Sequence, residues 1–169
     1  SMVTLLGVIT VGVLPGVLVA VGLALLQLLA RACHPHDAVL GRVPSTGGFH
    51  DIATHPEAIT VPGLVIYRFD ASLVFFNADY FKSRVRAAVD ASRAKVGWGW
   101  LGAETIAYVD TTGAASLEEV NRELADRGIE LAIASAKAPV RLMLDRTGLT
   151  QQIGAGRLFP TLESAVESV

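Results

Sequence analysis

The chain has 169 residues with 14 basic and 16 acidic side chains, so it lacks the strongly basic composition of a nucleic-acid-binding protein. Its single cysteine, Cys33, excludes an internal disulfide and a CxxC metal or redox pair. Hydrophobic residues make up 51% of the chain, and the excess lies at the start, where no charged side chain occurs from Met2 to Ala30. The sequence therefore divides into an apolar segment and a remainder with ordinary globular composition.

The apolar residues 2–32 are predicted to form one or more terminal transmembrane helices. Pro15-Gly16 interrupts them, since proline removes a backbone donor and disfavours helix in the residue before it. This predicts a break, with a short helix at about 3–13 and a second at about 16–32. A secretory signal peptide is a weaker alternative, because a basic start is missing and the apolar stretch is too long. A helix buried in a soluble core is also disfavoured, because the rest of the chain is too small to surround it.

Residues 33–60 are predicted to be a linker followed by the first β-hairpin of the globular domain. The cluster Cys33-His34-Pro35-His36 contains metal-binding residue types, but its spacing does not match zinc sites, and an interfacial linker is the preferred interpretation. Strands are expected at 37–43 and 49–52, with a turn between them.

Residues 61–169 are predicted to form an α/β core in which strands and helices alternate. The expected strands are 64–69, 73–76, 105–109, 129–134 and 158–159, and the expected helices are 77–95, a helix after residue 113 that ends near Gly128, 138–147 and 162–168. Gly97–Trp100 is predicted to be a loop whose tryptophans either contact a partner or the membrane interface, or cap the end of the sheet. This pattern calls for parallel strands with right-handed crossovers, and the hairpin adds antiparallel edge strands. The predicted fold is thus a mixed β-sheet with helices mainly on one face.

The candidate site is the strand-to-helix turn Asp110-Thr111-Thr112-Gly113. Ligands of open α/β sheets gather beyond the carboxyl ends of the strands, and a helix N-terminus favours anions. The threonines offer hydroxyl groups, Gly113 allows close backbone approach, and phosphorylation of Thr112 would place new negative charge beside Asp110. Ordinary helix capping by Asp110 explains the same residues equally well. No GxSxG, Walker A or HExxH motif is present, so no enzymatic activity is predicted.

Several short motifs together resemble the sulfate permease (SulP) family of anion transporters, from their last membrane segments to the end of the STAS domain. The matching stretches are Gly12-Val13-Leu14-Pro15-Gly16, Arg31-Ala32-Cys33-His34-Pro35, Val39-Leu40-Gly41-Arg42-Val43-Pro44, Tyr67-Arg68-Phe69-Asp70, Phe75-Phe76-Asn77-Ala78-Asp79-Tyr80-Phe81 and Asp110-Thr111-Thr112-Gly113. STAS domains resemble bacterial anti-sigma factor antagonists, whose Asp-Ser-Ser-Gly loop is phosphorylated at the second serine. Thr112 aligns with that serine, and the substitution keeps a hydroxyl group but changes what a kinase would recognise.

The resemblance implies a STAS domain on the cytoplasmic side of the cell membrane, in a multi-pass protein that carries out secondary active transport of sulfate or a related anion. It implies a regulatory or assembly role for this chain, since the anion site of the family lies in earlier membrane helices. The expected partners are the rest of the transporter membrane domain, a second copy in a homodimer and a regulatory protein. No obligatory cofactor is expected, but the resemblance makes a guanine or adenine nucleotide a candidate ligand at the 110–113 loop and at Phe76-Asn77. The alternatives are a membrane-anchored phospho-switch protein of the anti-sigma-antagonist kind and a small nucleotide-binding module.

Overall fold

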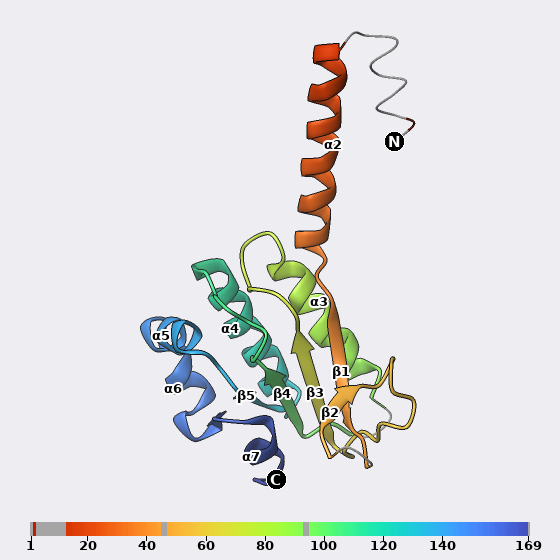
Figure 1. Ribbon diagram of the computed structural model, residues 1–169. Coiled ribbons are helices and arrows are strands. Elements are labelled where there is room, and N and C mark those ends of the chain that lie inside the picture. Colours follow the sequence, from red (N-terminus) through yellow and green to blue (C-terminus); the bar gives the residue numbers. More distant parts are fainter. Residues whose placement is uncertain (1, 3–12, 45–46, 93–94, 169) are drawn as a thin grey trace. The chain divides into compact units, whose positions relative to one another are not determined.

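The structure is a computed structural model that describes residue 2 and residues 13–44, 47–92 and 95–168 (Figure 1). The chain forms two compact units, Ser1–His34 and Pro35–Val169. The short helix predicted at about 3–13 falls outside the described residues, apart from Val13.

Helix α2 (Val13–Cys33) is the described part of the first unit. It begins three residues before the predicted start at 16, so Pro15 lies in its first turn, where a missing backbone N–H costs no helical hydrogen bond. Arg31 in the last turn is favoured by the helix dipole. The 19 residues Pro15–Cys33 are long and apolar enough to cross a membrane.

The second unit is built on one six-stranded mixed sheet in the order β2-β1-β3-β4-β5-β6. Its strands are β1 (Asp37–Arg42), β2 (Phe49–Asp51), β3 (Leu64–Phe69), β4 (Trp98–Gly102), β5 (Glu130–Ala134) and β6 (Leu158–Phe159). Strand β1 is antiparallel to β2 and β3, whereas β3 to β6 run parallel to one another. The predicted mixed sheet with an antiparallel hairpin at its edge is confirmed.

The helices of this unit lie mainly on one face of the sheet, as predicted. They are α3 (Ala78–Asp90), α4 (Thr111–Asp126), α5 (Ala138–Arg146), α6 (Leu149–Ile153), the short 3-10 helix η1 (Ala155–Arg157) and α7 (Leu162–Val166). Side chains of α3 to α6 form the larger core with β3, β4 and β5, represented by Phe81, Leu117 and Leu144. Helix α7 contributes Ala165 to a smaller core on the opposite face, which is centred on Trp100.

The prediction for residues 97–109 is wrong. The strand lies at Trp98–Gly102, where a loop was expected, and of the predicted strand 105–109 only Val109 forms a β-bridge, with Leu73. Alternating glycine and tryptophan favoured a loop, but β3 and β5 pair with this segment on both sides. Trp100 is consequently only 1% exposed and lies in the core, whereas Trp98 is partly buried at the start of the strand.

The predicted strand 73–76 is also wrong, because Val74 to Asn77 form a turn. The Asn77 amide holds this turn: its Oδ1 accepts from Val74 N at 2.9 Å, and its Nδ2 donates to Ser72 O at 3.0 Å. Asn77 occupies the N-cap position of α3, but its side chain makes no capping hydrogen bond to that helix.

Two helix boundaries and one additional helix differ from the sequence prediction. Helix α3 ends at Asp90, short of the expected end near 95, and α4 begins at Thr111, inside the predicted 110–113 loop. Helix α6 was not expected; it follows Gly148, whose φ of 73° lies in the left-handed region that glycine adopts at no steric cost.

Candidate functional site

The candidate site lies at the carboxyl ends of the parallel strands, where the connections after β3 and β4 run side by side. Leu73 forms a parallel bridge with Val109. Leu73 N donates to Tyr108 O at 3.0 Å, and Asp110 N donates to Leu73 O at 3.1 Å. These backbone bonds hold the two connections together at the point where α4 begins.

The Asp110 carboxylate joins α4 to the turn before α3. One oxygen, Oδ1, accepts from Gly113 N at 2.6 Å and caps the helix. The other, Oδ2, accepts from Phe75 N at 2.9 Å. Asp110 is therefore a helix cap, as the sequence allowed, and also a tether between segments 35 residues apart.

Gly113 is buried because the backbone of α4 passes very close to Leu73. A Cβ atom at position 113 would lie 2.2 Å from Leu73 O and 2.8 Å from Leu73 C. The close backbone approach that the sequence suggested at Gly113 thus occurs, but its partner is the chain itself. Ser116, also buried, donates to Gly113 O at 2.8 Å and reinforces the first turn of the helix.

Thr111 and Thr112 form the exposed part of the site. Both side chains lie in the first turn of α4, where the positive end of the helix dipole favours an anion. A phosphate carried by Thr112 would add about −1.5 to −2 charges at this point. This new charge would lie beside the Asp110 carboxylate, which already accepts hydrogen bonds from two backbone N–H groups.

The two residues predicted as nucleotide contacts differ in accessibility. Phe76 is 37% exposed and meets Phe75 edge to face, with ring centroids 5.2 Å apart. Asn77 is buried, and its amide bonds to the backbone of the 72–77 turn, so it shapes the turn that carries the two rings.

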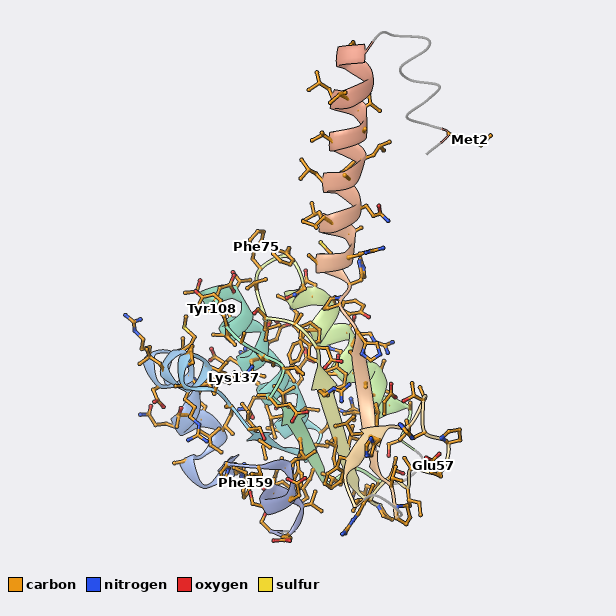
Figure 2. The ribbon with its side chains drawn as sticks, in the orientation of Figure 1. Met2, Glu57, Phe75, Tyr108, Lys137 and Phe159 are labelled. Carbon is orange, nitrogen blue, oxygen red and sulfur yellow. The ribbon has the colours of Figure 1, made fainter. Side chains whose placement is uncertain are left out.

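Sequence reasoning missed Phe75 and Tyr108, which are 70% and 50% exposed at the same end of the α/β unit (Figure 2). The two adjacent phenylalanines were assigned to a strand, in which one of them would point into the core. The signal available in the sequence was the position of two adjacent aromatic residues directly before the helix expected from residue 77.

The chain enters the sheet at this same end, through an ion-pair cluster around Asp70. Arg68 Nε donates to Asp70 Oδ1 at 2.7 Å, and His36 Nδ1 lies 2.8 Å from Asp70 Oδ2. Burial by itself would raise the pKa of the Asp70 carboxyl, but the hydrogen bonds from Arg68 and His36 outweigh it and hold that pKa below its usual value. Among the described residues, no three histidine, cysteine or carboxylate side chains are grouped as a metal site.

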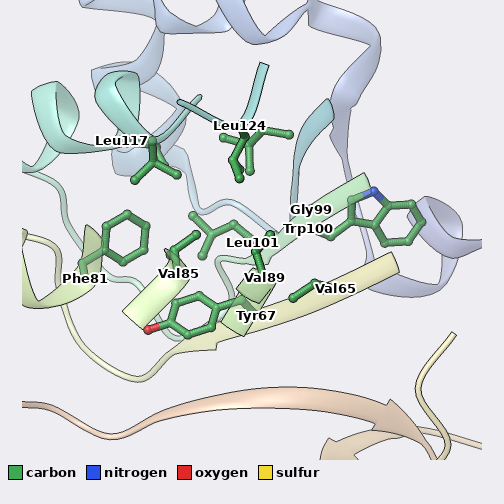
Figure 3. A pocket seen from close by; sticks show the side chains of 12 residues that line it. Val65, Tyr67, Phe81, Val85, Val89, Gly99, Trp100, Leu101, Leu117 and Leu124 are labelled. Carbon is green, nitrogen blue, oxygen red and sulfur yellow. The ribbon is translucent and has the colours of Figure 1, made fainter. Parts of the chain in front are cut away.

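An apolar cavity lies between the sheet and helices α3 and α4 (Figure 3). Its volume is about 20 Å³, and its walls include Phe81, Leu101 and Leu117. A space of this size holds at most about one water molecule. It is a packing void in the core and is far too small for a nucleotide.

The chain is similar to known proteins in both sequence and fold. Residues 55–165 match the family model of the STAS domain. A probable sulfate transporter from Mycobacterium tuberculosis is 44% identical over 168 residues, which cover 99% of this chain and 30% of that protein. The chain thus spans less than a third of the length of this curated relative.

Solved structures also resemble the fold. The murine Slc26a9 anion transporter in its inward-facing state gives a TM-score of 0.81 at 20% identity, covering 98% of this chain and 27% of that one. The anti-sigma factor antagonist SpoIIAA in its unphosphorylated form gives a TM-score of 0.51 at 18% identity, covering 65% and 90% of the two chains. At these identities the likeness concerns the fold alone.

Proposed function

The chain belongs to the STAS domain family, and from this premise we propose that it is the cytoplasmic regulatory and assembly domain of a secondary active transporter for sulfate or a related anion. The observation that carries the proposal is the order of the two units. A helix apolar enough to span a membrane precedes the STAS fold directly, and nearly the whole chain aligns with a probable sulfate transporter. The proposed location is the cell membrane, with the rest of the transporter and a second copy of it as partners.

The proposed regulatory element is Asp110-Thr111-Thr112-Gly113. Thr112 is exposed at the N-terminus of α4, where a phosphate or another anion is favoured. A phosphate on Thr112 would compete with the Asp110 carboxylate for the N–H groups of the first helical turn and repel it. The same carboxylate also accepts a hydrogen bond from Phe75 N, so modification of Thr112 would loosen the turn that precedes α3.

Uptake of radiolabelled sulfate by the full-length transporter tests this role. Thr112→Glu, which imitates part of the phosphate charge, is expected to change the uptake rate relative to Thr112→Ala. The matched control is the same pair of substitutions at Thr54, which is exposed outside the loop. Equal rates for both Thr112 variants and the unaltered protein would mean that Thr112 has no regulatory role and is only part of the first helical turn.

A guanine or adenine nucleotide is the proposed ligand of the same loop, with its phosphates at the N-terminus of α4 and its base on the exposed ring of Phe76. Titration with GTP and with ATP should shift the amide NMR signals of residues 110–116, and Phe76→Ala should weaken the response. No shift at millimolar nucleotide would exclude this ligand.

The second candidate is a phospho-switch protein of the anti-sigma-antagonist kind with a membrane anchor, which the fold likeness to SpoIIAA favours. The gene sequence upstream of Met2 separates the two. Many further membrane spans there support the transporter, whereas a start codon at Met2 supports the anchored switch.

A further inference from the structure

Three aromatic side chains form an exposed surface, the aromatic edge, at the carboxyl ends of the parallel strands. They are Phe75, Phe76 and Tyr108. Phe75 and Tyr108 lie at the same end of the α/β unit (Figure 2), and Tyr108 O accepts the hydrogen bond of Leu73, two residues before Phe75. Adjacent exposed aromatic side chains are uncommon on a surface that meets only water.

The fold holds these rings outward. The core beneath them is already filled by Phe69, Leu73 and Phe81, which are at most 1% exposed. The Asn77 amide closes the turn that carries the two phenylalanines, and Asp110 binds Phe75 N. The rings have no space to turn inward, so their exposure is built into the domain.

The chain enters the domain at the same edge. The first residue of β1, Asp37, pairs with Phe69, the last residue of β3, and the aromatic turn follows Phe69 within a few residues. Helix α2 ends at Cys33, so residues 34–36 alone connect the helix to β1. Four Cα steps span at most about 14 Å.

We propose that Phe75 and Tyr108, the two most exposed rings of the aromatic edge, insert into the head-group region of the membrane that α2 crosses. Phenylalanine and tyrosine are side chains that the membrane interface accepts, because their rings are apolar and the tyrosine hydroxyl reaches water. Asp79, 98% exposed in the first turn of α3, shares the Lys82 ammonium with Glu119, so two carboxylates face one cation there. This excess of negative charge disfavours an anionic lipid surface, and the surface that fits is zwitterionic. The proposal rests on the proposed function, since it requires α2 to be a membrane helix.

Spin labels on single cysteines test it in the whole chain, reconstituted in phosphatidylcholine bilayers. In a Cys33→Ser background, one label is placed by Phe75→Cys, one by Ile59→Cys and one by Leu25→Cys. Ile59 is the matched control, because it is an exposed apolar side chain (63%) that bridges to Arg42, at the far end of β1 from Asp37. Leu25 reports whether α2 lies in the bilayer. Label depth is measured from the relative accessibility to oxygen and to a water-soluble nickel complex.

The expected result is a label at 75 about 5 Å below the lipid phosphates, a label at 25 deeper still, and a label at 59 in water. If the label at 75 is in water while the label at 25 is in lipid, the insertion of the aromatic edge is refuted and the membrane tether is not. A label at 75 shielded from both reagents also overturns it, because a protein surface then covers the ring. A label at 25 in water overturns the membrane tether of the proposed function. In the unsubstituted chain, lipids carrying a nitroxide should broaden the amide signals of residues 74–77; unaltered signals there would contradict the insertion without any cysteine variant.

Discussion

Replacing Asp110 is expected to loosen the candidate site from both sides, because its two carboxylate oxygens serve two segments. Asp110→Ala removes the helix cap at Gly113 N, which costs about 1 kcal/mol. It also removes the acceptor for Phe75 N, a hydrogen bond to a charged group, which contributes about 1 kcal/mol more because the turn is partly open to water. The expected loss in the free energy of unfolding is therefore about 2 kcal/mol, or a Tm lower by roughly 8 °C.

Asp110→Asn separates the two contributions. Its single carbonyl oxygen still caps α4, since asparagine is as good an N-cap as aspartate. Its NH₂ group cannot accept from Phe75 N, so about half of the loss is expected.

Urea unfolding of the full chain in detergent micelles gives the measurement. It is followed through tryptophan fluorescence, since both tryptophans, Trp98 and Trp100, lie in the central strand β4. Glu104→Ala, at an exposed carboxylate in the connection that leads to Asp110, is the control and should leave the midpoint unchanged. An unaltered midpoint for Asp110→Ala would refute the tether and the cap together. Equal losses in Asp110→Ala and Asp110→Asn would refute the division between them.

Two further predictions concern neighbouring residues. Gly113→Ala should destabilise the domain by about 1–3 kcal/mol, because its methyl group has to displace Leu73 O; urea unfolding checks this, and a loss below about 0.5 kcal/mol would mean that α4 shifts freely. The Asp70 carboxyl has a pKa below its unfolded value, despite burial, through Arg68 and His36. Its stabilisation is therefore present above the unfolded pKa and is lost as the pH falls through the folded one. In Asp70→Asn the free energy of unfolding should therefore fall less steeply as the pH drops below about 4. An acid-unfolding curve parallel to that of the unsubstituted chain would contradict this expectation.

Local patterns predicted much of the α/β unit. The strands 37–42, 64–69 and 130–134 have runs of β-branched and apolar residues, and their bounds agree with the structure to within about a residue. The prediction failed at Trp98–Gly102, where two glycines beside two tryptophans indicate a turn. Pairing with β3 and β5 on both sides outweighs this local preference, because it satisfies the backbone and buries Trp100.

The sequence by itself determined the division into an apolar segment and an α/β domain, and it singled out Asp110-Thr111-Thr112-Gly113, because hydropathy and capping are local properties. Only the tertiary structure decided what Asp110 does with its second oxygen and why Gly113 cannot carry a side chain. The partners in those contacts, Phe75 and Leu73, are 35 or more residues away in the chain. No local pattern records such a contact, since it exists only once the connections after β3 and β4 lie side by side.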